Sequence, residues 1–265
     1  MARPVIALLT DFGTRDHYVG VMKGVLLGIC PDAALVDLTH EIPPQDVSAA
    51  AHELAASVRF FPSGTVFLVV IDPGVGTGRR ALAARAGPYA FVGPDNGVLA
   101  GVLRSATSAD VVALRNPAFA RADISRTFEG RDRFAPAAGW LACGQPLDAF
   151  GPRIDDWCDL VLPAAERDPD GGVRGAVVRV DRFGNLVTNI GTADVPAACL
   201  APGVACIRVA GQEIAGPVGT YAEAPEHGLC VLVGSTGQLE IAVRNGNAAE
   251  RLGVGVGAPV VVRER

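Results

Sequence analysis

The sequence is short of the features that mark several classes of protein. None of its apolar runs approaches the length of about 18 residues that predicts a membrane-spanning helix. Positive charge is not in excess either, because 23 lysines and arginines stand against 28 aspartates and glutamates, for a net charge of -5. We therefore expect no membrane span and no nucleic-acid partner.

Closely spaced cysteine pairs are also missing from the sequence. The six cysteines, at positions 30, 143, 158, 199, 206 and 230, show no Cys-x-x-Cys spacing and fall mostly inside apolar runs. This pattern predicts reduced, buried thiols in a cytoplasmic protein, not disulfides. It also offers no cluster of metal ligands, so we expect no bound metal.

What the chain has is a large apolar fraction, 49% of its 265 residues. In residues 1–162, runs rich in β-branched residues alternate with stretches of helical periodicity. This alternation predicts an α/β domain with an open, mostly parallel sheet and flanking helices. The expected elements of its first half are strands at Val5–Thr10, Ala34–Leu38 and Val66–Ile71 and helices at Tyr18–Cys30 and Gln45–Phe60.

The composition changes at residues 163–172, a polar stretch rich in turn residues that we interpret as a domain linker. Residues 173–265 carry almost no helical signal. Their short strand candidates, separated by glycine and proline, predict a smaller all-β, barrel-like domain. These candidates are Val173–Val180, Leu186–Ile190, Cys206–Val209, Leu229–Val233, Leu239–Val243 and Val260–Arg263.

The most informative motif follows the apolar strand Val66–Ile71. Asp72 comes directly after that strand, so we expect its carboxylate at the carboxyl end of a parallel strand, where open α/β sheets place their ligand chemistry. A glycine-rich turn then leads to two cations, Arg79 and Arg80. A strand-ending turn with a surface salt bridge explains the same residues, and this stretch alone does not separate the two interpretations.

Four other polar stretches have equally ordinary explanations. Asp11 follows the first strand as Asp72 follows its own, but an Asx turn or a helix cap would also account for it. The charge-dense loop Thr127–Pro136 precedes an apolar helix at Ala137–Cys143 and is either a solvated turn or a pocket wall. The polar residues at 180–186 and 234–243 are each most simply hairpin turns.

Taken together, four separated motifs resemble, in order and spacing, those of the S-adenosylmethionine hydroxide adenosyltransferase family, the relatives of the fluorinase and chlorinase enzymes. The resemblance covers nearly the whole chain. The motifs are Thr10-Asp11-Phe12-Gly13, Asp72-Pro73-Gly74-Val75-Gly76, Phe128-Glu129-Gly130-Arg131-Asp132 and Asp181-Arg182-Phe183-Gly184-Asn185.

The resemblance implies hydrolysis of S-adenosylmethionine, in which an activated water attacks the 5′ carbon of the ribose and adenosine and methionine leave. Asp72 would accept a hydrogen bond from that water, and Arg79 would stabilise hydroxide character or fix Asp72 as an ion pair. The halogenating relatives carry other residues at these two positions, since a carboxylate would repel a halide. No cofactor is implied, because S-adenosylmethionine is the substrate.

One position departs from the family pattern. The family usually has a histidine between the residues that correspond to Phe128 and Gly130, and this chain has Glu129 there. A carboxylate accepts hydrogen bonds but does not donate them at neutral pH. We hypothesise that Glu129 takes over the histidine's orienting role with an altered pH dependence; His17 is a weaker candidate to replace it.

The resemblance also assigns substrate-binding roles. Asp11 would bind the ribose hydroxyls, and Phe128 would lie beside the substrate. The amino-acid tail would be held by Asp181, Asn185 and Ser235, with Asp181 suited to an ammonium group. The adenine would be covered by Phe183, and its edge would be read by backbone near Val243 with Glu240 beside it.

Members of this family are trimers whose pocket lies between two subunits, so the resemblance implies a homotrimer with an intersubunit active site. Two other functions stay open. The chain could be a binding protein that holds adenosine or S-adenosylmethionine without turnover, or, as a less favoured choice, an S-adenosylmethionine-dependent halogenase. The reaction products separate the three: adenosine with methionine, none, or a 5′-halogenated adenosine.

Overall fold

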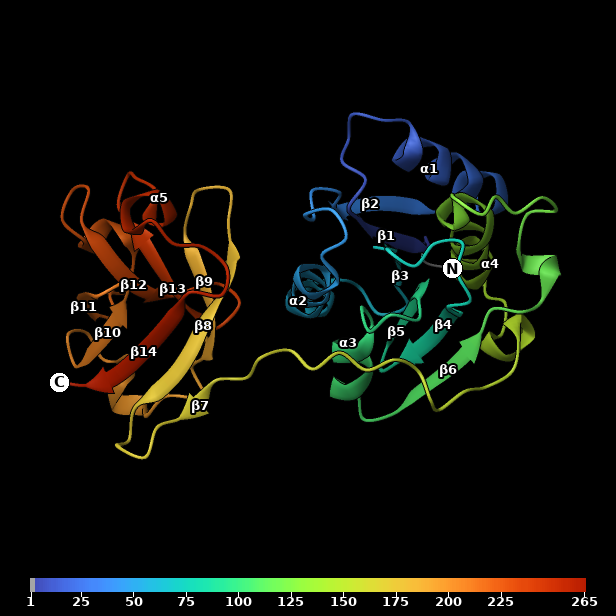
Figure 1. The fold of residues 1–265 in the computed structure, drawn as a ribbon. Helices are drawn as coiled ribbons and strands as arrows, with labels where there is room; N and C mark the ends of the chain where they lie inside the picture. Colours follow the sequence, from blue (N-terminus) through green and yellow to red (C-terminus); the bar gives the residue numbers. More distant parts are fainter. Residues whose placement is uncertain (1–2) are drawn as a thin grey trace. The chain divides into compact units, whose positions relative to one another are not determined.

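The computed structural model describes residues 3–265, which form two compact units (Figure 1). The first ends at Val161, and the second is Leu162–Arg265. Within the stretch interpreted as a linker, Glu166–Arg167 forms the short strand β7, which pairs with β8, Val173–Val180, of the second unit.

The first unit contains a six-stranded sheet in the order β2-β1-β3-β5-β4-β6. The pairs β1–β2, β1–β3 and β3–β5 are parallel, and β4 runs antiparallel to both of its neighbours. The predicted α/β class with a mostly parallel sheet is therefore confirmed. The strands are β1 Val5–Thr10, β2 Ala34–Thr39, β3 Val66–Val70, β4 Ala81–Ala86, β5 Tyr89–Pro94 and β6 Ala109–Ala113.

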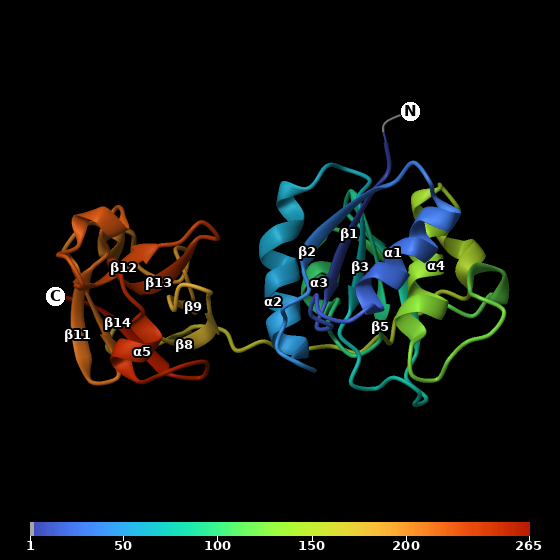
Figure 2. The ribbon, with the colours of Figure 1, turned by 90° about the horizontal axis from the view of Figure 1, so that it is seen from above.

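Helices cover both faces of this sheet, as Figure 2 shows, with α1 and α4 on one face and α2 and α3 on the other. Strand β3 lies at the centre and is buried along its whole length, as its uninterrupted apolar run predicts. No helix in the described residues 3–265 is long and apolar enough to cross a membrane. The helices are α1 Tyr18–Ile29, α2 Val47–Ser57, α3 Ala100–Ser105 and α4 Ala135–Ala142.

Two of these elements differ from the sequence-based prediction. Helix α2 starts at Val47, two residues later than expected, because Gln45 has a left-handed backbone (φ 67°) and Asp46 caps the helix by accepting a hydrogen bond from Ala49 N at 2.9 Å. The charged stretch before α4 is not a simple loop. Residues Gly130–Phe134 form a π-helical turn, η3, held inward by the fully buried side chains of Asp132 and Phe134.

The second unit is a curved antiparallel sheet in the order β11-β10-β14-β8-β9-β13-β12. A bridge between Val218 and Leu232 nearly closes it, so the predicted barrel-like all-β domain is confirmed. Its core is formed by the inward-facing apolar residues of these strands. The strands are β8 Val173–Val180, β9 Leu186–Gly191, β10 Ala205–Val209, β11 Gln212–Gly216, β12 Leu229–Val233, β13 Gln238–Val243 and β14 Pro259–Glu264.

Sequence patterns miss two elements of this unit. Strand β11 has little apolar content, but it pairs with β10 through a tight turn in which both Ala210 (φ 49°) and Gly211 (φ 74°) are left-handed, as a type I′ hairpin turn requires. Helix α5, Ala248–Leu252, is short and is capped by Asn247, whose side chain accepts from Glu250 N.

The cysteines agree with the prediction in one respect and not in another. All six are free. Cys30, Cys199 and Cys230 are buried, but Cys143 and Cys158 are exposed, so the expectation of buried thiols is wrong for these two. Cys143 lies just past the end of α4, where the chain returns to the surface.

Candidate functional site

Asp72 and Arg79 form a nearly buried, bidentate ion pair beyond the end of β3. Arg79 Nε donates to Asp72 Oδ1 at 2.8 Å, and Arg79 Nη2 donates to Asp72 Oδ2. The two side chains are only 6% and 10% exposed. Such a fork-shaped, desolvated pair holds both groups in one orientation. The alternative of a solvated surface salt bridge does not describe this geometry.

The turn between these two residues requires a glycine at position 76. Gly76 has a φ of 77°, and a Cβ placed there would lie 2.6 Å from the carbonyl oxygen of Arg126. The turn is closed by the hydroxyl of Thr77, which donates to the carbonyl oxygen of Gly74 at 2.6 Å. This close packing explains how a seven-residue separation brings Arg79 back onto Asp72.

Glu129 joins the same cluster from a distant part of the chain. Its Oε2 accepts from Arg79 Nη1 at 3.1 Å and from Arg133 Nε at 3.0 Å. The Arg79 guanidinium also lies over the ring of Phe134, 5.1 Å from its centroid. Burial opposes the charge of Arg79, but its hydrogen bonds and attraction to Asp72 and Glu129 outweigh burial and raise the pKa of its guanidinium.

Asp11 lies beside Asp72 because β1 and β3 are parallel neighbours, with Thr10 opposite Val70. Its Oδ2 accepts from the backbone N–H of Gln45 at 2.8 Å. It is not the cap of the following helix, since α1 begins after His17 and has no side-chain cap. The capping alternative for Asp11 is therefore wrong.

These groups surround a cavity of about 260 Å³ at the carboxyl edge of the sheet, which we call the front cavity. Asp11, Asp72, Phe128 and Glu129 line it, and Arg79 does not. Arg79 lies behind them and lines a separate cavity of about 240 Å³, the rear cavity, together with Arg133; Glu129 lines both. Arg79 does not enter the front cavity itself, but it is hydrogen-bonded to two carboxylates that line it, those of Asp72 and Glu129.

Two residues considered from the sequence are not part of the front cavity. His17 is exposed and stacks on Tyr18, with ring centroids 4.8 Å apart. Arg80 points to a different part of the unit: its Nε donates to Asp95 Oδ2 at 2.6 Å and its Nη1 to Asp156 Oδ1 at 2.5 Å. Of the two cations that follow Asp72 in the sequence, only Arg79 therefore belongs to the cluster around it.

The second unit has a larger cavity of about 970 Å³, which we call the C-terminal cavity. Two hairpin loops and one strand face bring its polar residues together: the β8–β9 loop, the β12–β13 loop and β13. It is lined by the six residues expected to bind substrate in this half of the chain: Asp181, Phe183, Asn185, Ser235, Glu240 and Val243.

The β8–β9 hairpin is organised by the side chain of Asp181. Its Oδ1 accepts from Phe183 N and Asn185 N, and its Oδ2 accepts from Asn185 Nδ2, each at 2.9 Å. The hairpin leaves the ring of Phe183 74% exposed over the cavity. The residues that look like a simple turn in the sequence thus form a turn that also presents an aromatic face.

Tyr221 lines this cavity too, although no sequence pattern singled it out. Its hydroxyl donates to Glu240 Oε1 at 2.5 Å, and Glu240 is buried. Burial and this contact with Glu240 raise the pKa of the Tyr221 hydroxyl well above its ordinary value. The carboxylate of Glu240 is therefore held from one side, with its other oxygen close to Gly234.

In residues 3–265 no group of three or more His, Cys, Asp or Glu side chains is placed to hold a metal ion. The two cavities that the described residues build, one in each unit, are lined by carboxylates and aromatic rings, and the C-terminal cavity by guanidinium groups as well.

Comparison with known proteins gives matches along nearly the whole chain. Residues 6–151 match the SAM hydroxide adenosyltransferase N-terminal domain, and residues 175–261 match the C-terminal domain of the same name.

Among individual proteins, the (R)-S-adenosyl-L-methionine hydrolase of Thermus thermophilus is 41% identical over 97% of this chain and 98% of that protein. A fluorinase of Actinoplanes sp. is 32% identical over 72% of this chain and 73% of its own. The crystal structure of an uncharacterised conserved protein from Thermotoga maritima superposes with a TM-score of 0.92 at 37% identity, covering 97% of this chain and 99% of that one.

Proposed function

Because the chain belongs to the SAM hydroxide adenosyltransferase family, we propose that it is an enzyme that hydrolyses S-adenosylmethionine to adenosine and methionine. The observation that supports this most is the carboxylate of Asp72, held by Arg79 at the wall of the front cavity. An oriented acceptor of this kind suits a water molecule better than a halide ion, which a carboxylate repels.

In the proposed reaction, water attacks the 5′ carbon of the ribose as the bond from that carbon to sulfur breaks. The sulfonium becomes the neutral thioether of methionine and needs no proton, so the protein has to hold the water in line and accept its proton. Asp72 would accept a hydrogen bond from the water, and Arg79 would offset the negative charge that develops beside it. Glu129, next to both, would orient the same group.

Substrate binding follows the division of the polar residues. Asp11 uses only its Oδ2 to accept from Gln45 N, and we propose that its carboxylate accepts hydrogen bonds from the ribose hydroxyls. Phe128 would pack beside the sugar. The C-terminal cavity would take the rest of the substrate: Asp181, Asn185 and Ser235 at the amino-acid tail, and Phe183, Glu240 and Val243 at the adenine. No cofactor enters this scheme.

The sizes of the two cavities support an active site that needs both of them, as in the homotrimer that the family resemblance implies. The front cavity, at about 260 Å³, is smaller than the roughly 300–1,000 Å³ typical of small-molecule sites. The C-terminal cavity is within that range but has none of the proposed reacting groups. We propose that each active site combines the front cavity of one subunit with the C-terminal cavity of a neighbour, in a cytoplasmic protein whose six cysteines are free.

The name of the Thermus relative specifies one configuration at a stereocentre, (R). A sulfonium with three different substituents is such a centre, and in-line attack requires the carbon–sulfur bond to point away from the water. We propose that this chain has the same preference. Incubation with separated sulfur epimers, followed by chromatography of the products, tests activity and preference together.

The expected result is equal amounts of adenosine and methionine, formed faster from the (R) epimer. Bound substrate without product would favour the binding-protein alternative. A 5′-halogenated adenosine in the presence of halide would favour the halogenase alternative. Light scattering of the purified protein tests the trimer separately.

A further inference from the structure

Glu129 shares one carboxylate oxygen between two guanidinium groups. Its Oε2 lies 3.1 Å from Arg79 Nη1 and 3.0 Å from Arg133 Nε. The side chain of Glu129 is 11% exposed and that of Arg133 is 29% exposed, so water screens this contact less than it would at the open surface. Arg133 is the residue four positions after Glu129, on the π-helical turn η3.

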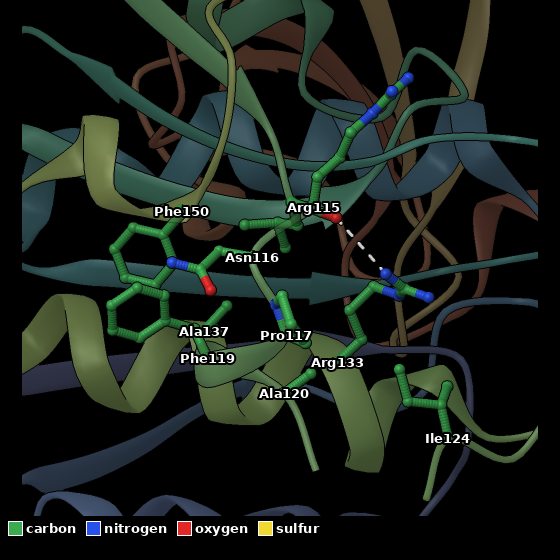
Figure 3. Close-up of a pocket in the computed structure, with 10 residues that line it drawn as sticks. Arg115, Asn116, Pro117, Phe119, Ala120, Ile124, Arg133, Ala137 and Phe150 are labelled. Carbon is green, nitrogen blue, oxygen red and sulfur yellow. Dashed lines mark hydrogen bonds between the residues drawn. The ribbon is translucent and has the colours of Figure 1, made fainter. Parts of the chain in front are cut away.

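Arg133 is also fixed from its other side. Its Nη1 donates to the carbonyl oxygen of Leu114, just past β6, at 3.4 Å, and Figure 3 draws this bond as a dashed line. The same view places its side chain beside a small cavity with Phe119, Ala137 and Phe150 among its lining residues. Arg133 does not line the front cavity, so it can act on the proposed chemistry only through Glu129.

The contact between Arg133 and Glu129 matters because it balances the charges around Asp72. Two carboxylates, Asp72 and Glu129, stand against two guanidinium groups, Arg79 and Arg133. Without Arg133, both carboxylates would share the single cation of Arg79. The remaining negative charge would oppose the build-up of hydroxide character on a water next to Asp72, because like charges at short range repel strongly in a desolvated site.

We propose that Arg133 is a positioning residue for the proposed hydrolysis. It orients Glu129 and offsets the negative charge of that carboxylate, so that Arg79 remains paired with Asp72. The inference rests on the proposed function and adds a residue to it. It also predicts a specific coupling: Arg133 should matter only while residue 129 carries a carboxylate.

A double-mutant cycle on the full-length protein tests that coupling, with kcat and KM measured for the wild type, Arg133→Leu, Glu129→Gln and the double variant. We expect Arg133→Leu alone to lower kcat about tenfold, the effect of losing one charge-assisted hydrogen bond. KM for the positively charged substrate should not rise, because a cation has been removed. In the Glu129→Gln background, Arg133→Leu should leave kcat unchanged or raise it.

Matched controls separate this role from a merely structural one. Arg133→Lys keeps the charge and should recover most of the lost kcat, and Arg133→Gln removes the charge while keeping a polar side chain, in case leucine prevents folding. Arg153→Leu removes an exposed arginine paired with Asp110 and should keep wild-type kinetics. Circular dichroism melting curves establish that each variant is folded.

The proposal is overturned if Arg133→Leu lowers kcat by the same factor in both backgrounds, or if it has no effect beside Glu129. A wild-type protein that releases no adenosine would instead refute the proposed function, and the inference would fall with it. The two failures are distinguished by the first measurement of the series.

Discussion

Thr10 and His40 lie in contact across β1 and the segment after β2: Thr10 Oγ1 is 2.8 Å from His40 Nδ1. The carbonyl oxygen of His40 also accepts from Gly13 N at 2.7 Å. Both residues are buried. Asp11 is therefore enclosed between two points of attachment, one on each side of it in the sequence, although His40 itself does not line the front cavity.

Replacing His40 by leucine, or Thr10 by valine, should weaken this attachment by about 1 kcal/mol. We expect KM for S-adenosylmethionine to rise several-fold, as estimated for a hydrogen bond of that size, with a smaller change in kcat. The double variant should be no worse than the worse single one, because both substitutions remove the same contact. Additive losses in steady-state kinetics would contradict this account.

Asp72→Asn should lower kcat by about 100-fold or more, since an amide cannot accept the proton of the attacking water. Arg79→Lys keeps a charge but cannot form the two-pronged pair with Asp72, and we expect a loss of about tenfold. Adenosine release measured by chromatography checks both. Near wild-type turnover in Asp72→Asn would remove Asp72 from the mechanism.

Glu129→Ala should reduce turnover and change its dependence on pH, because Arg79 and Arg133 would both lose the same acceptor. Glu129→His supplies the family's usual residue. This variant should be more active when Arg133 is also replaced by leucine than when Arg133 is kept. The measurement is kcat over a range of pH for the wild type and the three variants. An unchanged pH profile in Glu129→Ala would mean that Glu129 has no orienting role.

Asp132 should make the first unit sensitive to acid. Burial alone would raise the pKa of this fully buried carboxyl, but hydrogen bonds from Arg131 and from Ser125 N, with the charge of Arg131, lower it below its ordinary value. The folded state therefore binds this proton less readily than the unfolded state. Its contribution to stability is present above the ordinary carboxyl pKa and is lost as the pH falls through the lowered one.

Asp132→Asn leaves its arginine partners without a buried counter-charge and should cost about 3 kcal/mol at neutral pH. Urea unfolding at about pH 7 and about pH 3 should show a smaller difference between variant and wild type at the lower value. A difference that stays constant with pH would contradict the assignment.

Tyr221→Phe should leave Glu240 Oε1 without its hydroxyl donor and so disturb the wall of the C-terminal cavity. We expect a loss of stability of about 1–2 kcal/mol and a several-fold rise in KM, with kcat nearly unchanged. Urea unfolding and steady-state kinetics measure these quantities. A fall in kcat with KM unchanged would place Tyr221 in the chemical step instead.

The sequence predicted the parts of this protein that depend on local pattern. The apolar run of β3 and the acid that follows it were enough to place Asp72 at the carboxyl edge of a parallel sheet, and Asp11 follows by the same reasoning. Arg79 and Arg80 could both be selected because they follow the glycine-rich turn after Asp72.

The partner of each individual side chain could not be predicted from local pattern. Nothing in the sequence distinguishes Arg79, which faces Asp72, from Arg80, which pairs with Asp95 and Asp156. Arg133 was missed because the π-helical turn that aims it at Glu129 is stabilised by burial of neighbouring side chains, which periodicity does not reveal. Tyr221 was missed because it lies in a short 3-10 turn and its partner, Glu240, lies on strand β13.

The division of the chain at Val161 separates the acid–arginine cluster from the hairpin that carries Asp181 and Phe183. Genetic exchange at that boundary between two relatives would therefore transfer the loops that line the C-terminal cavity and leave the proposed reacting groups, Asp72, Arg79 and Glu129, in their original sequence context. In such chimaeras, ligand specificity would change while the reaction stays the same.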